Sequence, residues 1–269
     1  MFPTIVRRFS SIILCMSALA FISCSKDNDT NVTPDPDPEP GNGATVKTGV
    51  YKIVNLAADT TATSGSAAVS LYYSLEENRV VPESQRQTGN WDIVLYGIYN
   101  SSVYPNNGVA TGSPGYGGPG QAKIYLVVDR KFDAQYYDTL NFKPRSLPIP
   151  NNLFDAAFAA VKTVPAEDSK FFTRDVGLDH FQNLSDGWGY YDFYGALFPG
   201  NPLKTHVVYT MPRVMIIKTH KGHYAKLMIR SIYKDSPQDP DRNNKPGFVT
   251  FQYAIQMDGS KNLDISTNN

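Results

Sequence analysis

The side chains that could bind a transition metal are few in this 269-residue chain, and they lie in its second half. Imidazole nitrogen and thioether sulfur are both metal ligands, and four histidines and four methionines follow residue 45. They are His180, His206, His220, His223, Met211, Met215, Met228 and Met257. Both cysteines, Cys15 and Cys24, come earlier. Among nitrogen and sulfur ligands, a metal site in the later part of the chain would therefore use His or Met rather than thiolate.

The methionines differ in their sequence context. Met215, Met228 and Met257 fall within predicted strands, where a flexible thioether usually fills the hydrophobic core. Met211 precedes Pro212 at the edge of a strand, and we expect it to be more accessible than the other three. Met211 is therefore the methionine most open to ligation.

Two histidines flank a predicted hairpin turn at Lys221-Gly222. His220 and His223 could face each other across that hairpin and bind a metal as a pair. Solvated side chains at a hairpin tip are the simpler interpretation.

The sequence shows no catalytic motif. It contains neither a Gly-x-Ser-x-Gly elbow nor a His-Glu-x-x-His zinc motif. The Gly-rich stretch 112–120 is not followed by Gly-Lys-Ser/Thr, so we expect a mobile loop or lid there rather than a phosphate-binding loop. Asp92, beside Trp91, is expected to form structural hydrogen bonds. The sequence therefore favours a binding protein over an enzyme.

Runs of aromatic and β-branched residues predict a mostly β fold with antiparallel strands and long loops. Aromatic residues make up 12% of the chain and suit a pleated, half-buried surface. The predicted strands cover residues 50–56, 68–75, 79–81, 91–99, 123–128, 214–219, 224–233 and 247–257. Gly222 can supply the positive φ that a tight hairpin needs, so 214–219 and 224–233 should pair.

Residues 153–161 predict the single short helix. Two asparagines, Asn151 and Asn152, can cap its start, and Pro165 lies beyond its end. Apolar residues spaced i, i+3, i+4 and i+7 share one face, which should pack on the sheet. They are Phe154, Ala157, Phe158 and Val161.

Three segments with different charge follow one another. Residues 1–23 are typical of an export signal, with basic residues before a short apolar run, and Ser23-Cys24 matches a bacterial lipobox that predicts lipidation of Cys24. Residues 24–45 alternate proline and acid and predict a disordered tether. We expect one folded domain over 46–269. The formal net charge of zero gives no basic surface of the kind that nucleic acid requires.

Three motifs, in this order behind the lipobox and tether, resemble the HmuY family of haem-binding lipoproteins from Bacteroidetes. The motifs are Gly-Asn-Trp-Asp-Ile at 89–93, Lys-Gly-His-Tyr-Ala-Lys-Leu at 221–227 and Phe-Val-Thr-Phe-Gln-Tyr at 248–253. His223 stands where the family pattern has lysine. The resemblance covers roughly residues 50–257.

The resemblance implies a single antiparallel β domain shaped like a grasping hand, with non-covalent b-type haem held between projecting loops. It also implies that haem is taken from host haemoproteins and passed to a TonB-dependent outer-membrane receptor. The acidic residues just behind Cys24 resemble the surface-export signal of Bacteroidetes lipoproteins, although a plain solvated linker would have similar composition. The implied location is the outer membrane, at the cell surface.

Haem iron takes axial ligands such as His and Met, and the family uses two well-separated donors in the middle-to-late region. That scheme implies His180 paired with His206 or with Met211, and no metal other than haem iron. Aromatic side chains could line a porphyrin slot; the candidates are Trp188, Tyr190, Tyr191 and Phe193. Aromatic platforms also suit sugar rings, so the alternative is a surface glycan- or protein-binding lipoprotein on the same fold without haem.

Overall fold

The computed structural model describes residues 44–57, 68–165, 167–179 and 186–266. All of them belong to one compact unit, Pro38–Asn269. The predicted signal, Cys24, most of the predicted tether and His180 lie outside the described residues. Within the described ranges no helix has both the length and the apolar character needed to cross a bilayer.

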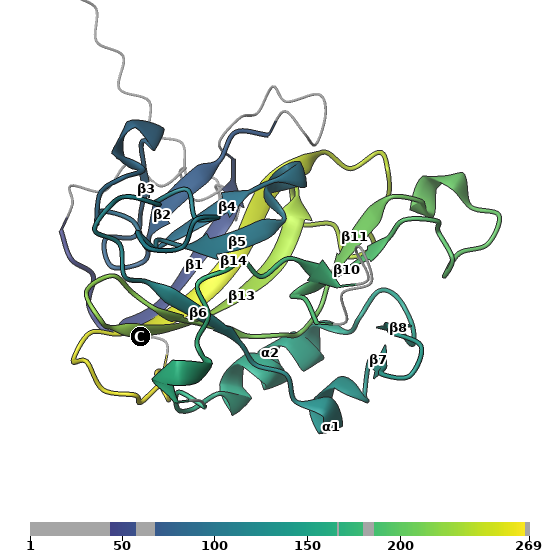
Figure 1. Cartoon of the computed structure of the whole chain (residues 1–269). Helices are drawn as coiled ribbons and strands as arrows, with labels where there is room; N and C mark the ends of the chain where they lie inside the picture. Colours follow the sequence, from purple (N-terminus) through teal and green to yellow (C-terminus); the bar gives the residue numbers. More distant parts are fainter. Residues whose placement is uncertain (1–43, 58–67, 166, 180–185, 267–269) are drawn as a thin grey trace, which may run out of the picture. The chain divides into compact units, whose positions relative to one another are not determined.

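A five-stranded antiparallel sheet is the largest element (Figure 1). Its strands, in spatial order, are β1 (Gly49–Leu56), β14 (Pro246–Gln256), β13 (Tyr224–Tyr233), β12 (Met215–Lys218) and β6 (Lys123–Leu126). The predicted hairpin is confirmed, because β12 and β13 pair through Lys218 and Tyr224. At the turn, Gly222 has a φ of 94°, which a residue with a side chain rarely adopts.

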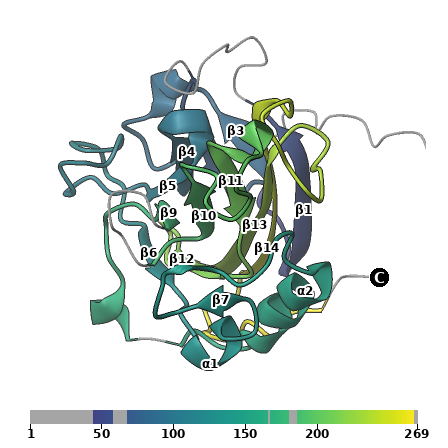
Figure 2. The ribbon, with the colours of Figure 1, turned by 90° about the vertical axis from the view of Figure 1, so that its right-hand side faces the viewer.

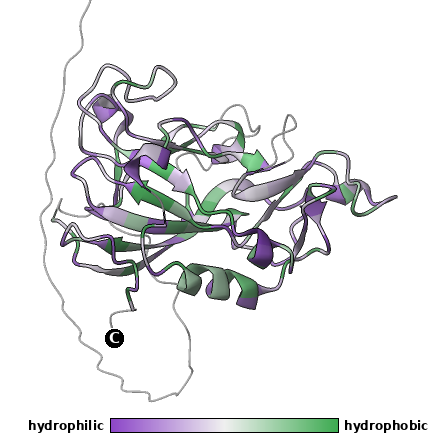
Figure 3. Ribbon diagram, turned by 60° about the horizontal axis from the view of Figure 1, so that its bottom comes forward, coloured by the Kyte–Doolittle hydropathy of each residue, from purple (hydrophilic) through white to green (hydrophobic). Residues whose placement is uncertain are grey.

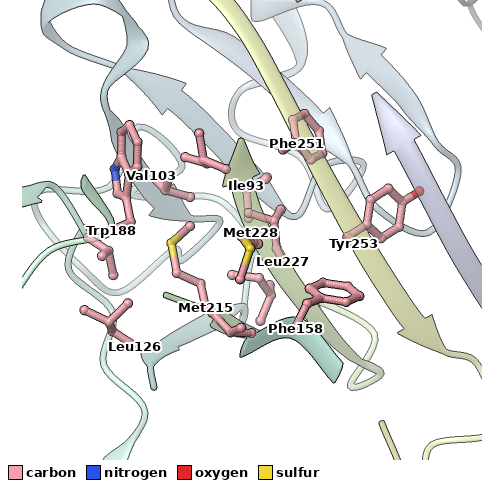
Figure 4. Packing of buried hydrophobic residues seen from close by; sticks show 14 of the residues in the cluster. Ile93, Val103, Leu126, Phe158, Trp188, Met215, Leu227, Met228, Phe251 and Tyr253 are labelled. Carbon is pink, nitrogen blue, oxygen red and sulfur yellow. The ribbon is translucent and has the colours of Figure 1, made fainter. Parts of the chain in front are cut away.

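A four-stranded antiparallel sheet forms the second layer. Its order is β3 (Arg79–Val81), β2 (Leu71–Ser74), β4 (Ile93–Tyr96) and β5 (Ser102–Pro105). The two sheets share one hydrophobic core, and Tyr73 of β2 meets Phe251 of β14 edge-on at 5.4 Å between ring centroids. Met215 and Met228 fill this core beside Trp188 and Leu227 (Figure 4), as predicted for methionines in strands.

A smaller sheet of three strands adjoins β13 (Figure 2). It consists of β11 (Val207–Thr210), β10 (Gly189–Asp192) and β9 (Leu178–Asp179), and β9 and β10 are parallel. Two further strands, β7 (Tyr137–Asp138) and β8 (Lys143–Pro144), form a separate pair. Short 3₁₀ turns occur at Glu83–Gln85, Ile98–Asn100, Asp168–Lys170 and Pro202–Lys204.

The predicted helix is confirmed as α2 (Asn151–Ala160), which is mostly apolar in sequence (Figure 3). Phe154, Ala157 and Phe158 are its buried residues. The predicted asparagine cap is wrong, because Pro150 is the N-cap and no side chain caps the helix. At its other end, Lys226 Nζ donates to the carbonyls of Phe158 and Val161 at 2.9 and 2.8 Å. This ammonium thus satisfies carbonyls that a helix end leaves unpaired.

Sequence patterns did not reveal a one-turn helix, α1 (Arg130–Asp133). Asp129 caps it, because its side chain accepts from the amides of Lys131 and Phe132. The overall expectation of a mostly β fold with antiparallel sheets is confirmed by these elements.

The Gly-rich stretch 112–120 is a packed loop, so the prediction of a mobile lid is wrong. A Cβ on Gly115 would lie 2.4 Å from Asn106 Oδ1 and 3.0 Å from the Trp91 ring, and one on Gly120 would lie 2.2 Å from Asn106 Oδ1. Glycine is needed here for close approach rather than for motion. The loop therefore packs against Trp91, which is fully buried.

The two sheets are joined at one end by a polar cluster, which we call the clasp: Glu76, Asp92, Thr219, Lys221 and His223. Glu76 Oε1 accepts from Thr219 Oγ1 at 2.6 Å and lies 2.8 Å from His223 Nδ1, while Oε2 lies 3.1 Å from Lys221 Nζ. Asp92 accepts backbone hydrogen bonds from Leu75, Glu76 and His220. The structural role predicted for Asp92 is therefore confirmed.

Both hairpin histidines make contacts at the clasp or beside it. His223 contacts Glu76, while the His220 ring packs so closely on Gly89 that a Cβ there would lie 2.5 Å from Nε2. The two rings thus make separate contacts, and no cluster of three or more potential metal ligands occurs among the described residues.

Burial, and secondly the negative charge of Glu76, raise the pKa of Asp92 to about 6. The folded state thus retains a proton on Asp92 between pH 4 and 6 that the unfolded chain releases. Asp92 consequently favours folding most below pH 4, and this contribution is lost as the pH rises through 6. Glu76 behaves oppositely: hydrogen bonds from Thr219, His223 and Lys221 outweigh its burial and lower its pKa.

We expect Glu76→Gln to lower the pKa of Asp92 below 6, because the neighbouring negative charge is removed while burial remains. Carboxyl carbon NMR titration of Asp92 measures this directly. Glu77→Gln is the matched control, since Glu77 is the next residue but pairs with Arg79 at 2.6 Å. An Asp92 pKa that stays near 6 in Glu76→Gln would show that burial alone sets it.

Candidate functional site

A cavity of about 990 Å³ lies where the three-stranded sheet meets the two larger sheets. Its walls combine apolar side chains with a few polar and charged ones, the composition of small-molecule sites. The apolar lining residues are Ile98, Leu126, Val128, Phe172, Val176, Leu178, Val208 and Pro246. The charged and potentially ligating ones are Arg174, Asp175, Asp186, Tyr191, His206, Tyr233, Asp241 and Arg242.

The β10–β11 hairpin carries His206 to this cavity. Tyr191 of β10 pairs with Val208 of β11, and the His206 amide donates to Asp192 O at 2.8 Å just before β11 begins. His206 has a φ of 58°, a left-handed conformation uncommon outside glycine but more frequent for His than for most residues. The loop is therefore held in an unusual conformation at the point where the imidazole projects.

The His206 ring is oriented by two aromatic neighbours. Its Nδ1 lies 2.8 Å from the Tyr191 hydroxyl, and the Phe193 ring contacts it edge-on at 4.5 Å between centroids. Burial raises the pKa of the Tyr191 hydroxyl, so this group is protonated at neutral pH. The Nε2 atom makes no hydrogen bond to any described residue. An imidazole held through Nδ1 with Nε2 open is the usual arrangement of a metal-ligating histidine.

The other aromatic candidates have different environments. Tyr191 lines the cavity, whereas Trp188 and Tyr190 are buried in the core, and Trp188 Nε1 donates to Ser101 O at 2.8 Å. Phe193 is 42% exposed and touches His206 from outside the cavity lining.

Met211 is fully buried, so the expectation that it is the accessible methionine is wrong. Its amide donates to Trp188 O at 3.2 Å, and this long-range contact draws the residue into the core. A bond between Met211 sulfur and a ligand in the cavity would require the side chain to leave that packing. His180, the remaining candidate ligand, lies outside the described residues, although Leu178 and Asp186, close to it in sequence on either side, line the cavity.

A buried ionic network fixes the wall formed by β9. Arg213 Nη1 donates to Gly187 O at 2.8 Å and lies 3.4 Å from Asp179, and Nη2 lies 3.2 Å from Asp133. The hydroxyls of Tyr136 and Tyr137 donate to Asp133 and Asp179, each at 2.5 Å. Arg213 thereby connects α1, β9 and the start of β10.

Sequence reasoning missed the two arginines of the cavity, Arg174 and Arg242. Arg242 lies in a polar segment typical of a solvated loop, Arg174 follows two phenylalanines, and only the fold brings the two segments to one cavity. The one sequence signal for a binding residue was a charged side chain close behind two aromatic ones, in Phe171-Phe172-Thr173-Arg174.

Comparison with known proteins identifies a family. A profile of the HmuY family, described as "HmuY protein", matches residues 66–253. A structure from Bacteroides vulgatus, assigned as an HmuY-like haem-binding protein, is 14% identical, with a TM-score of 0.36 over 80% of this chain and 97% of that chain.

Two further structures are similar. A Bacteroides fragilis protein assigned as a lipoprotein is 11% identical, with a TM-score of 0.32 over 82% of this chain and 97% of that chain. The apo HmuY analogue of Tannerella forsythia is 13% identical, with a TM-score of 0.32 over 79% and 97%. No curated protein matches the chain. The profile match spans most of the chain and both halves of the described fold, and the chain therefore belongs to the HmuY family.

Proposed function

We propose that this protein binds haem non-covalently in the 990 Å³ cavity, with His206 as one axial ligand. The observation that carries the proposal is the His206 side chain in the cavity lining, whose Nδ1 is held by Tyr191 while Nε2 makes no hydrogen bond to any described residue. The apolar walls suit a porphyrin ring, and family membership supports haem as the ligand. Bound haem would supply an iron centre that accepts the imidazole nitrogen.

The second axial ligand in this proposal is His180, with Met211 as the alternative. Leu178 and Asp186 line the cavity on either side of His180 in the sequence, which supports the first choice. The complete burial of Met211 argues against the second.

The proposed role is haem capture rather than catalysis. The lipobox at Cys24 and the tether that follows support a protein anchored in the outer membrane and displayed at the cell surface. Haem taken from host haemoproteins would then pass to a TonB-dependent receptor. Family membership and these sequence features support this route.

Titration of the purified protein with haemin tests the proposal. We expect a shifted Soret band at micromolar protein with one equivalent bound, and Met211→Leu should leave the spectrum unchanged, because leucine keeps the core volume but lacks sulfur. His180→Ala should change the spectrum. Absence of any Soret shift in the unmodified protein would overturn the proposal.

One observation favours the alternative of a glycan-binding lipoprotein without haem. Phe193 and Tyr194 are 42% and 81% exposed, and their rings contact each other at 4.7 Å between centroids. Exposed aromatic faces can stack on sugar rings. Retention on a glycan array that Tyr194→Ala abolishes, together with no haemin binding, would favour this function.

A further inference from the structure

We propose that Arg174 and Arg242 form a carboxylate-binding pair on the cavity, which selects a tetrapyrrole by its propionate groups independently of iron ligation. The inference rests on the proposed haem-binding function and specifies the ligand class of the same cavity. It assigns recognition of the acid groups to two residues that lie far apart in sequence.

Arg174 is held on one wall by two short β-bridges. Phe172 exchanges backbone hydrogen bonds with Ile124 of β6, both 2.9 Å, and Val176 does so with Val103 of β5 at 2.9 and 3.0 Å. The guanidinium carbon of Arg174 lies 5.0 Å from the centroid of the Phe172 ring. Both residues line the cavity, so the cation lies beside an apolar surface.

Arg242 is held on another wall by the loop between β13 and β14. Its amide donates to Leu203 O at 2.9 Å, and its Nη1 donates to Thr205 Oγ1 at 3.3 Å. The same loop is anchored by Lys204, a buried side chain whose Nζ lies 2.6 Å from Asp239 and 2.8 Å from Pro240 O. These contacts position Arg242 next to His206 and Tyr191 in the lining.

The charged groups of the cavity differ in their protein partners. Among the carboxylates, Asp186 pairs with Arg130 at 2.9 Å, while Asp175 and Asp241 accept hydrogen bonds from the neutral Tyr96 hydroxyl and Asn243 amide. Neither Arg174 nor Arg242 forms an ion pair with a carboxylate in the described part of the chain. The two guanidinium groups are thus cations in the lining without an ion-pair partner among the described residues, and a ligand carboxylate could pair with each.

Guanidinium groups bind carboxylates through paired, charge-assisted hydrogen bonds. Two such groups around an apolar cavity suit a flat hydrophobic molecule that carries carboxylates. Because both arginines are exposed, each should contribute about threefold to tenfold in affinity, and added salt should weaken the effect.

The test measures fluorescence-detected affinities for three probes: haemin, iron-free protoporphyrin IX and protoporphyrin IX dimethyl ester. The variants are Arg174→Gln, Arg242→Gln and the double variant, with Arg86→Gln as an exposed arginine away from the cavity. We expect the double variant to lose about tenfold to a hundredfold in affinity for haemin and for protoporphyrin IX. The dimethyl ester should be bound equally by all variants, and Arg86→Gln should match the unmodified protein.

The outcomes separate this inference from the proposed function. Unchanged affinity for protoporphyrin IX in the double variant overturns the carboxylate pair while haem binding stands. Equal losses for the diacid and the ester overturn it too, since the arginines would then act through structure. Arginine-dependent binding of protoporphyrin IX without binding of haemin supports the pair and overturns the haem function. Failure of all three probes to bind overturns both.

Discussion

Replacing Arg213 by methionine is expected to lower the free energy of unfolding by about 3–5 kcal/mol, the usual cost of leaving a buried charge without its partner. Arg213 is 1% exposed. Methionine fills part of the space and packs against the Tyr137 ring, over which the guanidinium now lies at 5.1 Å. The loss should therefore come from charge rather than from volume.

The physical reason lies in the two buried carboxylates that lose their contact with the Arg213 guanidinium. Asp133 is 2% exposed and Asp179 is fully buried, and each already accepts from a tyrosine hydroxyl at 2.5 Å. A hydrogen bond from a neutral hydroxyl does not replace a guanidinium beside a buried negative charge.

Urea unfolding at neutral pH measures the effect. Arg230→Met is the matched control, because Arg230 pairs with Asp155 at 2.9 Å but the aspartate is 70% exposed; its expected cost is about 0–1 kcal/mol. A loss below about 1 kcal/mol in Arg213→Met would contradict the assignment of the network as a structural support. Adding Asp179→Asn to Arg213→Met should recover part of the free energy of unfolding, since it removes one of the two buried negative charges.

The elements that the sequence predicts well are those whose pattern is local. β13 follows the predicted range of 224–233 residue for residue, and α2 ends one residue before the expected 161. Both have long, regular periodicity. β9 and β11 escaped prediction because they are only two and four residues long, and because β9 pairs in parallel with β10, which begins ten residues after β9 ends.

The site was only partly predictable for a related reason. Residue type together with the family resemblance was enough to choose His206 and Tyr191 as candidates, and both line the cavity. Burial was not predictable: Met211 looked accessible beside a proline but lies in the core through its contact with Trp188. Arg242 reaches the cavity only through the docking of the β13–β14 loop on Leu203, a long-range contact that no local pattern encodes.

Replacing His206 by alanine is expected to abolish the ligand-field signature of the haemin complex and to weaken haemin binding. Loss of a hydrogen bond to a metal ligand costs roughly 10–100-fold in affinity, and loss of the ligand itself should cost more. The iron would lose the imidazole nitrogen, whose ring Tyr191 and Phe193 hold in position. His206 is exposed, so the substitution removes no core packing. The readouts are the Soret position and the dissociation constant, and added imidazole should restore the spectrum by filling the vacated position.

Two variants separate ligation from orientation. Tyr191→Phe keeps the ring but removes the hydroxyl 2.8 Å from Nδ1, so the Soret band should persist while affinity falls about tenfold. His223→Ala removes a histidine that contacts Glu76 in the clasp and lies outside the cavity lining, and it should leave both readouts unchanged. If His206→Ala binds haemin with an unaltered spectrum, the iron is not bound by His206. A hydroxyl that only orients the imidazole can be removed while Nε2 still binds the iron. If Tyr191→Phe loses the Soret band as completely as His206→Ala does, the Tyr191 hydroxyl therefore takes part in ligation itself.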